Sequence, residues 1–414
     1  MTSRVWLLPR GTRNLPSSHI QTPEAVWRHL RLTEAHRGKR ILAMSRRRRI
    51  AVDGTPITGR AKGAGRVVKN LLTALPKVDP ENTYVALVTE EGARILQDGL
   101  HDIELAAVPA MSGLRWETVG MGKAGRKQGA DLMFTVREAV GFGGPPTVMH
   151  LFEPPAYRLH PRGTEGARAL KPVAKDWFLH ANLRASIKRA SAVTAGSEDT
   201  AAWLRRKYGI EPRVIPGGIE AAFFAHIETD ARGTGDVPRY FLHPASGDPR
   251  ENTELVLQAF ARASLSNIVL RTFGTPEWLQ ATIRSRASAL GLSDLVITEG
   301  WVSDERLRAL YAGALALLHP SRYEGFGGYP ALEAMALGIP VVALAAPGTR
   351  EALAGAALLV EQENPELLAH ALTELADSPT LRTSLVLAGR ERVRGLTWEA
   401  AAKAFVTVFH DVLA

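Results

Sequence analysis

The hydrophobic residues of this chain form short apolar runs that alternate with stretches of helical spacing. From Ile50 onward, runs rich in Val, Ile, Leu and Ala are followed by turn residues and then by apolar positions three or four residues apart. Continuous apolar runs are typical of strands buried on both faces, as in a parallel sheet covered by helices. The first-half strands that we predict span residues 50–53, 84–89, 103–108, 132–135, 147–151, 192–194 and 213–215.

The same alternation restarts after a polar stretch rich in Gly and Pro, from Pro216 to Pro238. The strands predicted there span residues 240–243, 268–273, 295–298, 314–319, 339–344 and 357–360, and the chain ends in a helix over 398–413. Two such series predict an α/β protein with two doubly wound, Rossmann-like domains, which bind ligands outside the carboxyl ends of their strands.

We therefore divide the chain into five predicted regions. They are a basic extension over 1–48, a first Rossmann-like domain over 49–220, a linker over 221–238, a second domain over 239–395 and a C-terminal helix over 396–414.

Composition agrees with two globular domains. The 414 residues are 45% hydrophobic and 22% charged, and no apolar run reaches the ~20 residues that span a bilayer. Cysteine is absent, which excludes disulfides, thiolate metal sites and cysteine nucleophiles and agrees with a reducing compartment.

The formal charge of +9 is concentrated near the start of the chain, where Arg46 to Arg49 form a run of four arginines. Residues 1–43 lack strong hydrophobic periodicity and the apolar region of a secretory signal, so we expect them to be disordered. One hypothesis is that translation begins at Met44, and an organellar transit peptide is the alternative. The arginine run is interpreted as a solvated flank, with attraction to a membrane or polyanion as the second interpretation.

The segment from His319 to Leu344 is the richest in candidate chemistry. It sets Glu324 and Glu333 around a glycine loop that opens a helix, with Pro330 in the first turn and Gly338 at the C-cap. Unpaired N–H groups and the helix dipole favour an anion such as a pyrophosphate at this point.

This segment resembles the donor-site signature of retaining glycosyltransferases of family 4, which have the GT-B fold. The signature has seven residues between its two glutamates, whereas eight separate Glu324 from Glu333, so the loop holds a one-residue insertion. The resemblance implies that Glu324 contacts the donor sugar and Glu333 the ribose hydroxyls. It also implies donor contacts from the loop residues Gly325, Phe326, Gly327 and Gly328. The GT-B fold implies an acceptor-side first domain, a donor-binding second domain, and a C-terminal helix that packs back on the first.

Two further matches lie in the first domain. The loop from Gly59 to Arg66 resembles the family's glycine loop, with Gly63 and Gly65 allowing close approach and Arg66 offering a cation. Rossmann dinucleotide spacing is absent because Val68 takes the third glycine's place. His150 matches a histidine that the family places near the donor sugar and acceptor, and a core histidine is the structural alternative.

Arg250 matches the family's arginine for the donor pyrophosphate, but Glu251 replaces the expected lysine. We expect this carboxylate to weaken phosphate binding unless it turns away or pairs with Arg250. Ser197, at a helix start, is interpreted as a cap. Weaker matches occur at 217–220 and 349–351.

The sequence contains no Asp-x-Asp at a strand end, no His-Glu-x-x-His and no Gly-x-Ser-x-Gly. The resemblance therefore implies a metal-independent retaining transferase that moves a hexosyl group from a nucleoside diphosphate sugar to an acceptor hydroxyl, with no cofactor and no metal. The acceptor stays open among small molecules, glycans and lipids, nucleic acid is not expected, and the location expected is cytoplasmic, with peripheral membrane contact left open. The alternatives are a GT-B-like nucleotide-sugar epimerase and a non-catalytic polyanion-binding protein.

Overall fold

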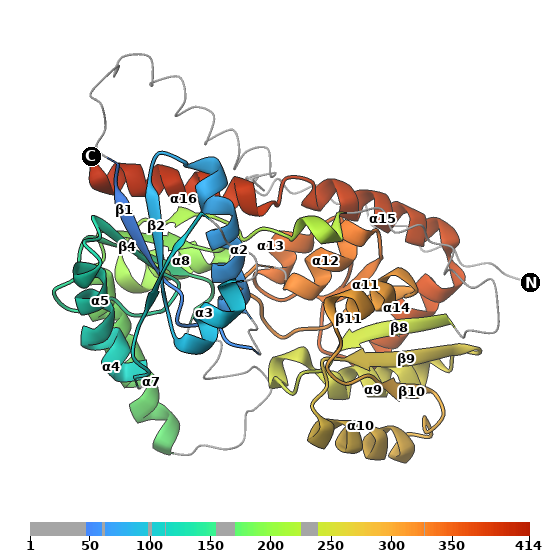
Figure 1. Cartoon of the computed structure of the whole chain (residues 1–414). Coiled ribbons are helices and arrows are strands. Elements are labelled where there is room, and N and C mark those ends of the chain that lie inside the picture. Colours follow the sequence, from blue (N-terminus) through green and yellow to red (C-terminus); the bar gives the residue numbers. More distant parts are fainter. Residues whose placement is uncertain are drawn as a thin grey trace, which may run out of the picture. The chain divides into compact units, whose positions relative to one another are not determined.

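The computed structural model describes residues 47–59, 63–97, 102–111, 113–154, 170–224, 239–326 and 328–414, and contains two parallel β-sheets covered by helices (Figure 1). Most of the predicted basic extension and most of the predicted linker lie outside these residues.

The first sheet has seven strands in the order β3-β2-β1-β4-β5-β6-β7, all paired in parallel. The strands are β1 Arg49–Asp53, β2 Thr83–Val88, β3 Glu104–Ala107, β4 Leu132–Thr135, β5 Thr147–Leu151, β6 Ala192–Ala195 and β7 Arg213–Val214. The helical segments are α2 Ala64–Val78, α3 Glu90–Gln97, α4 Gly113–Arg115, the π-helix η2 Trp116–Gly120, α5 Met121–Lys127, α7 Leu170–Arg189, α8 Glu198–Tyr208 and the 3₁₀ turn η3 Ala221–Phe223. The strand order reverses between β1 and β4, which is where such sheets bind ligands.

The second sheet has six parallel strands in the order β10-β9-β8-β11-β12-β13. The strands are β8 Arg239–Pro244, β9 Ile268–Phe273, β10 Val296–Thr298, β11 Ala316–His319, β12 Val341–Leu344 and β13 Leu358–Val360. The helices are η4 Pro249–Glu251, α9 Thr253–Ala263, α10 Glu277–Ala289, α11 Asp304–Ala312, α12 Tyr329–Leu337, α13 Thr349–Leu353, α14 Pro365–Asp377, α15 Pro379–Val393 and α16 Trp398–Leu413. Here the order reverses between β8 and β11, so the loops after these two strands meet at the switch point.

The predicted parallel α/β architecture is confirmed, and every predicted strand is present with ends displaced by no more than about two residues. The sequence pattern did not predict α3 or η2. The short α3 contains a glycine, and η2 interrupts a helical run with wider turns that the usual helical spacing does not describe.

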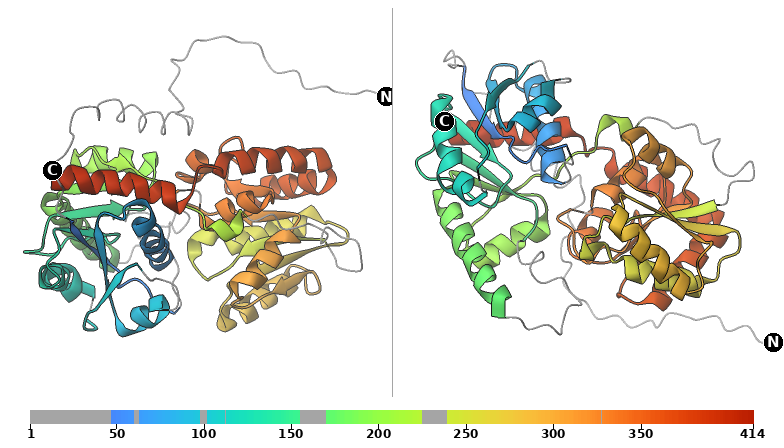
Figure 2. Two further views of the ribbon diagram at one scale, coloured as in Figure 1. Left: turned by 45° about the horizontal axis from the view of Figure 1, so that its top comes forward. Right: turned by 60° about the horizontal axis from the view of Figure 1, so that its bottom comes forward.

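The last helix, α16, belongs to the core of the first sheet (Figure 2). Its Phe405 and Phe409 rings meet Phe134 of β4 edge-on, with centroids 4.9 and 5.5 Å apart. Trp398, at the start of the helix, is buried in the same cluster, in keeping with a packing role. Aromatic pairs of this kind contribute about 0.5–1.5 kcal/mol each beyond the area they bury, so α16 is integral to this core.

Candidate functional site

The glycine loop after β11 is closed by backbone conformations that only glycine adopts readily. Gly328, at the N-cap of α12, has φ +78°, and Gly338, which ends the helix in the left-handed region, has φ +77°. Pro330 lies in the first turn, so the predicted start and stop of this helix are confirmed. Gly327 lies outside the described residues.

Space also requires glycine in this loop. A Cβ on Gly328 would lie 2.3 Å from His319 Nε2, and one on Gly325 would lie 2.5 Å from the Phe152 carbonyl oxygen. Phe326 is half-buried and packs against the core of the second sheet. The loop therefore folds directly over the end of β11.

Glu324 is buried and held by the histidine that ends β11. His319 Nε2 lies 3.0 Å from Glu324 Oε1, and the Arg250 guanidinium lies 4.0 Å from Oε2. Burial alone would raise the pKa of Glu324, but the His319 hydrogen bond and the Arg250 charge outweigh it and lower the pKa below its usual value. Glu324 is thus a buried carboxylate kept anionic by its neighbours.

Arg250 lies among three carboxylates. Its guanidinium is 3.1 Å from Asp248, 3.3 Å from Glu153 and 4.0 Å from Glu324. Burial opposes its charge, but these carboxylates keep its pKa above the usual value. A diphosphate arriving at Arg250 would compete with Glu153 and Asp248 for the same guanidinium.

Glu251, which replaces the expected lysine, is turned toward Ser246. Its carboxylate accepts hydrogen bonds from the Ser246 backbone N–H and hydroxyl, each 2.6 Å long. Burial is the main reason that its pKa is raised. The Arg250 side chain pairs with Asp248, Glu153 and Glu324 and not with Glu251, so of the two arrangements expected, the Glu251 carboxylate adopts the one that turns away.

Glu333 lies within α12 and pairs with the cation of the first glycine loop. Arg66 NH1 is 2.6 Å from Glu333 Oε1, and the Tyr311 hydroxyl donates to Oε2 over 3.2 Å. Burial raises the pKa of Glu333 to about 7, against the opposing charge of Arg66. Arg66 also bonds Glu220 at 2.5 Å, so its anionic partners in this structure are two glutamates of the chain.

The structure describes only part of the first glycine loop. Gly63 precedes α2 with φ +51°, and Gly65 is buried in the first turn of that helix beside Arg66. Residues 60–62 lie outside the described residues.

His150 is a buried residue near the end of β5. Its Nδ1 lies 2.9 Å from the Thr194 hydroxyl, and its ring meets Phe152 and Phe405 edge-on at 4.7 and 5.1 Å. Burial lowers its pKa to about 3, so the ring is neutral at physiological pH. This suits a hydrogen-bonding role or a core role, and disfavours proton transfer near neutrality.

Three contacts at this site were not predicted. His319 and Glu153 hold Glu324 and Arg250, and Glu351 accepts the backbone N–H groups of Glu198 and Asp199 at 2.8 and 3.0 Å. A histidine that ends a buried strand just before a glycine loop was a signal available in the sequence.

The cap assigned to Ser197 is confirmed, since its side chain accepts a hydrogen bond from the Thr200 N–H at the start of α8.

A second unpredicted cluster lies at the carboxyl ends of β1 and β4. Asp53 is fully buried and receives hydrogen bonds from Trp116 Nε1 at 3.2 Å and Arg137 Nε at 3.1 Å. Arg137 also reaches Glu117 at 3.3 Å, and burial is the main reason that the pKa of Glu117 is raised. These side chains occupy the edge of the first sheet where a ligand of that domain would bind.

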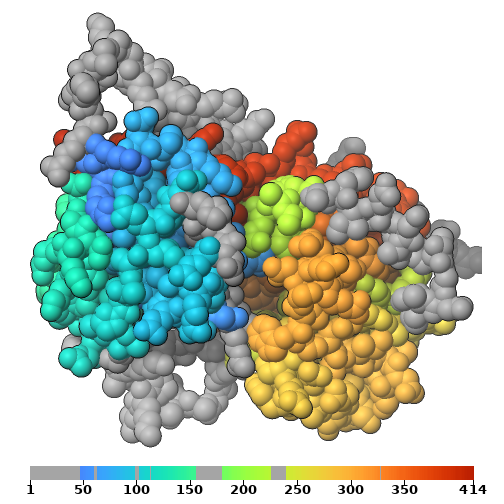
Figure 3. Space-filling model, in the orientation of Figure 1, coloured from blue at the N-terminus to red at the C-terminus, as the bar shows by residue number. Residues whose placement is uncertain are grey.

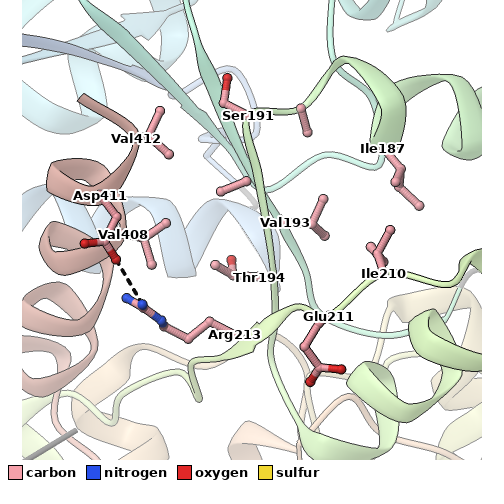
Figure 4. A pocket seen from close by; sticks show the side chains of 12 residues that line it. Ile187, Ser191, Val193, Thr194, Ile210, Glu211, Arg213, Val408, Asp411 and Val412 are labelled. Carbon is pink, nitrogen blue, oxygen red and sulfur yellow. Dashed lines mark hydrogen bonds and ion pairs between the residues drawn. The ribbon is translucent and has the colours of Figure 1, made fainter. Parts of the chain in front are cut away.

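A separate open pocket of about 660 Å³ lies beside β6 and α16, and of the residues described above only Thr194, the partner of His150, lines it (Figure 4). The Arg213–Asp411 ion pair, 2.9 Å long, lies in its wall. Within the described part of the chain, no group of three or more potential ligand side chains could hold a metal ion, and no helix is long and apolar enough to cross a membrane.

Residues 228–392 match the sequence model of the family described as glycosyl transferases group 1. This match covers less than half of the chain and includes the glycine loop after β11. Over 253 residues it is 30% identical to an MMP alpha-(1->4)-mannosyltransferase of Mycolicibacterium hassiacum, which covers 59% of this chain and 60% of the relative. It is also 30% identical to a D-inositol 3-phosphate glycosyltransferase of Acidothermus cellulolyticus over 226 residues, half of each chain. The matches thus span little more than half the length of these relatives.

Solved structures extend the likeness to both domains. Sucrose-phosphate synthase from Thermosynechococcus elongatus aligns with a TM-score of 0.72 at 22% identity, over 88% of this chain and 99% of its own. The Anabaena protein HepE in complex with UDP-glucose aligns with a TM-score of 0.67 at 17% identity, over 88% and 100%. These structures confirm the GT-B fold with two Rossmann-like domains, and the sequence match over residues 228–392 confirms the resemblance to glycosyltransferases.

Proposed function

We propose that this protein is a retaining glycosyltransferase that transfers a hexosyl group from a nucleoside diphosphate sugar to an acceptor hydroxyl without a metal, in the cytoplasm. The observation that carries the proposal is the anionic Glu324, held by His319 under the glycine loop that opens α12. The match of residues 228–392 to group 1 glycosyl transferases supports the proposal that the protein transfers a glycosyl group.

The donor diphosphate would bind at the start of α12. The first-turn N–H groups of a helix have no intrahelical acceptors, and the helix dipole places positive charge there. The nine-residue helix begins at Tyr329, directly after Gly328. Arg250 would supply the cation, with Glu153 released from it as the phosphates arrive.

The donor ribose would bind Glu333. Each carboxylate oxygen accepts more than one hydrogen bond, so the contacts to Arg66 and Tyr311 leave acceptor capacity for two ribose hydroxyls. Since hydroxyl donors favour the ionised carboxylate, donor binding would itself lower the raised pKa of Glu333.

The chemistry would be driven by electrostatic stabilisation. As the glycosidic bond lengthens, negative charge builds on the diphosphate and positive charge on the sugar ring. The helix N–H groups and Arg250 would stabilise the first, while the anionic Glu324 would lie beside the sugar and orient it. The acceptor hydroxyl then attacks on the same face and passes its proton to the departing diphosphate, so the nucleoside diphosphate leaves and no protein nucleophile is needed. Neutral His150 would support a sugar or acceptor hydroxyl by hydrogen bonding.

A thermal-shift screen tests the donor assignment. UDP, GDP, ADP and dTDP sugars, including glucose and mannose donors, are added to the full-length protein, because a ligand of the native state raises the melting temperature by mass action. The best donor is then incubated with candidate acceptors, and the anomeric configuration of the product is determined by NMR.

A product with the donor's anomeric configuration is expected. Inversion would contradict the retaining mechanism, and an epimerised donor formed without acceptor would indicate the epimerase alternative. Stabilisation by none of the donors would contradict the nucleotide-sugar site.

A further inference from the structure

Exposed hydrophobic side chains gather on one segment of the first domain. Met111, Leu114, Val119 and Phe142 are 46–56% exposed, and they make up four of the ten large hydrophobic residues that are exposed in the described part of the chain. Figure 3 shows this teal-coloured segment at the molecular surface. Scattered apolar side chains are normal on a protein surface, but a gathered set marks an interaction site.

The helical run α4-η2-α5 carries two of these residues, Leu114 and Val119. Trp116 faces inward, where its indole donates to Asp53, and Glu117 pairs with Arg137. The π-helix η2 follows α4, and its hydrogen bonds join residues five apart. Leu114 and Val119 are also five residues apart, so their side chains lie on the same exposed side of the run.

Phe142 is held beside this helical run by a backbone hydrogen bond. Its backbone N–H donates to the Thr118 carbonyl oxygen over 2.7 Å. Gly122 permits this approach, because a Cβ there would lie 2.5 Å from the Phe142 carbonyl oxygen and 2.9 Å from the Gly144 nitrogen. Two segments of the chain thus meet at this surface, where the Arg189 guanidinium lies over the Phe142 ring, 4.2 Å from its centroid.

Cations surround this surface. Arg115, Lys123, Arg126 and Lys127 are exposed, and none of them forms an ion pair with another described residue. Lys123 is one turn beyond Val119, and the Arg126 guanidinium is beside the Phe142 loop, 2.6 Å from where a Gly143 Cβ would lie.

The acidic residues of the same segment, Glu117, Asp131 and Glu138, each take part in an interaction. Glu117 pairs with Arg137, and Asp131 lies against Arg48 and the Arg49 backbone. Unpaired cations therefore dominate the charge of the exposed face.

We propose that this face is a docking surface for an anionic phospholipid bilayer. Apolar side chains with interspersed Lys and Arg on a helix suit the membrane interface, because the chains enter the acyl boundary while long cationic side chains reach the headgroup phosphates. A protein partner is less favoured, because lysine is depleted at protein interfaces and two of the four cations here are lysines. The docking surface does not depend on the proposed transferase function.

Vesicle flotation with the full-length protein tests the proposal. Binding is measured on phosphatidylcholine vesicles alone and on phosphatidylcholine mixed with phosphatidylglycerol. We expect binding to the mixed vesicles that weakens as salt is added, and little binding to the neutral ones.

A charge-reversal set locates the surface. The triple variant Lys123→Glu, Arg126→Glu, Lys127→Glu should reduce partitioning at least about tenfold, since each cation near an anionic surface contributes about a fivefold change. The matched control carries the same charge change on exposed cations elsewhere: Arg206→Glu, Lys207→Glu and Lys403→Glu. An equal loss in the control would overturn the proposal, because net charge or the basic run of residues 46–49 would then explain the binding.

An apolar set tests the insertion. Leu114→Ser, Val119→Ser and Phe142→Ser together should reduce binding at least about tenfold. The matched control replaces exposed hydrophobic residues of the second domain: Trp278→Ser, Leu367→Ser and Leu387→Ser. Single variants and thermal melts guard against misfolding.

Two further results would contradict the proposal. One is wild-type binding by the apolar variants. The other is a protein that dimerises by light scattering and becomes monomeric in the apolar triple variant, which would make the face a self-association surface.

Discussion

Replacement of Arg66 by Met should make protein stability depend on pH above 7. In the wild-type protein, the guanidinium lies 2.6 Å from Glu333, whose side chain is only 3% exposed and whose pKa is raised to about 7. A carboxyl with a raised pKa in the folded state favours folding at low pH. The pKa of this carboxyl is 4.5 in the unfolded chain and about 7 in the folded protein. Between these two pH values its ionisation increasingly destabilises the fold, and above pH 7 the cost is constant at about 3 kcal/mol.

Without the guanidinium, the pKa of Glu333 rises above 7, because the charge that opposed burial is lost. The folded variant then takes up a proton that the unfolded chain does not hold. Its stability should continue to fall by about 1.4 kcal/mol per pH unit above pH 7, while the wild type stays level. The difference contributed by this pair is therefore close to zero at pH 6 and grows by about 1.4 kcal/mol for each pH unit between 7 and the higher pKa of Glu333 in the variant.

Thermal melts of both proteins at pH 6, 7, 8 and 9 measure this difference. Loss of the Glu220 contact and of ring packing would add a constant offset, so the slope with pH is the decisive quantity. The control repeats the comparison in a Glu333→Gln background, where the slope should vanish. An Arg66→Met effect of equal size at pH 6 and pH 9 would refute the reasoning.

Three further predictions concern the candidate donor site. Gly328→Ala should lower the melting temperature and the donor affinity more than Gly355→Ala. Both glycines have positive φ, but only a Cβ at Gly328 would lie 2.3 Å from another side chain. Equal effects of the two variants in thermal melts would contradict this. Glu153→Gln should raise the affinity for nucleoside diphosphate severalfold in calorimetry, because a competitor for Arg250 is removed, and unchanged affinity would count against a diphosphate at that guanidinium. Glu251→Lys should lower the melting temperature without a large gain in nucleotide affinity, since the native carboxylate accepts two hydrogen bonds within its own loop; a large gain in affinity would show that the position still faces the phosphates.

The elements of the fold were predictable because each carries its own local pattern. Apolar runs locate the strands, and residues such as Gly338 stop helices through a backbone preference that acts within one turn. The π-helix Trp116–Gly120 has no such pattern. Its hydrogen bonds span five residues, so its apolar positions do not follow the three- and four-residue spacing that identifies an α-helix.

The candidate site was predictable only as a set of residues. The pairing of Arg66 with Glu333 joins residues far apart in the chain, and the turn of Glu251 toward Ser246 depends on loop geometry that the sequence pattern does not encode. A residue pattern gives the charges present, and only the fold determines which charge meets which.

Calorimetric titration of the best-stabilising nucleotide sugar into wild-type protein and Glu333→Ala tests the donor site most directly. The ribose hydroxyls would lose a charged acceptor, and such hydrogen bonds contribute about 1.5–3 kcal/mol, so we predict an affinity at least tenfold weaker in the variant. Equal affinity in the two proteins would contradict the assignment of this site.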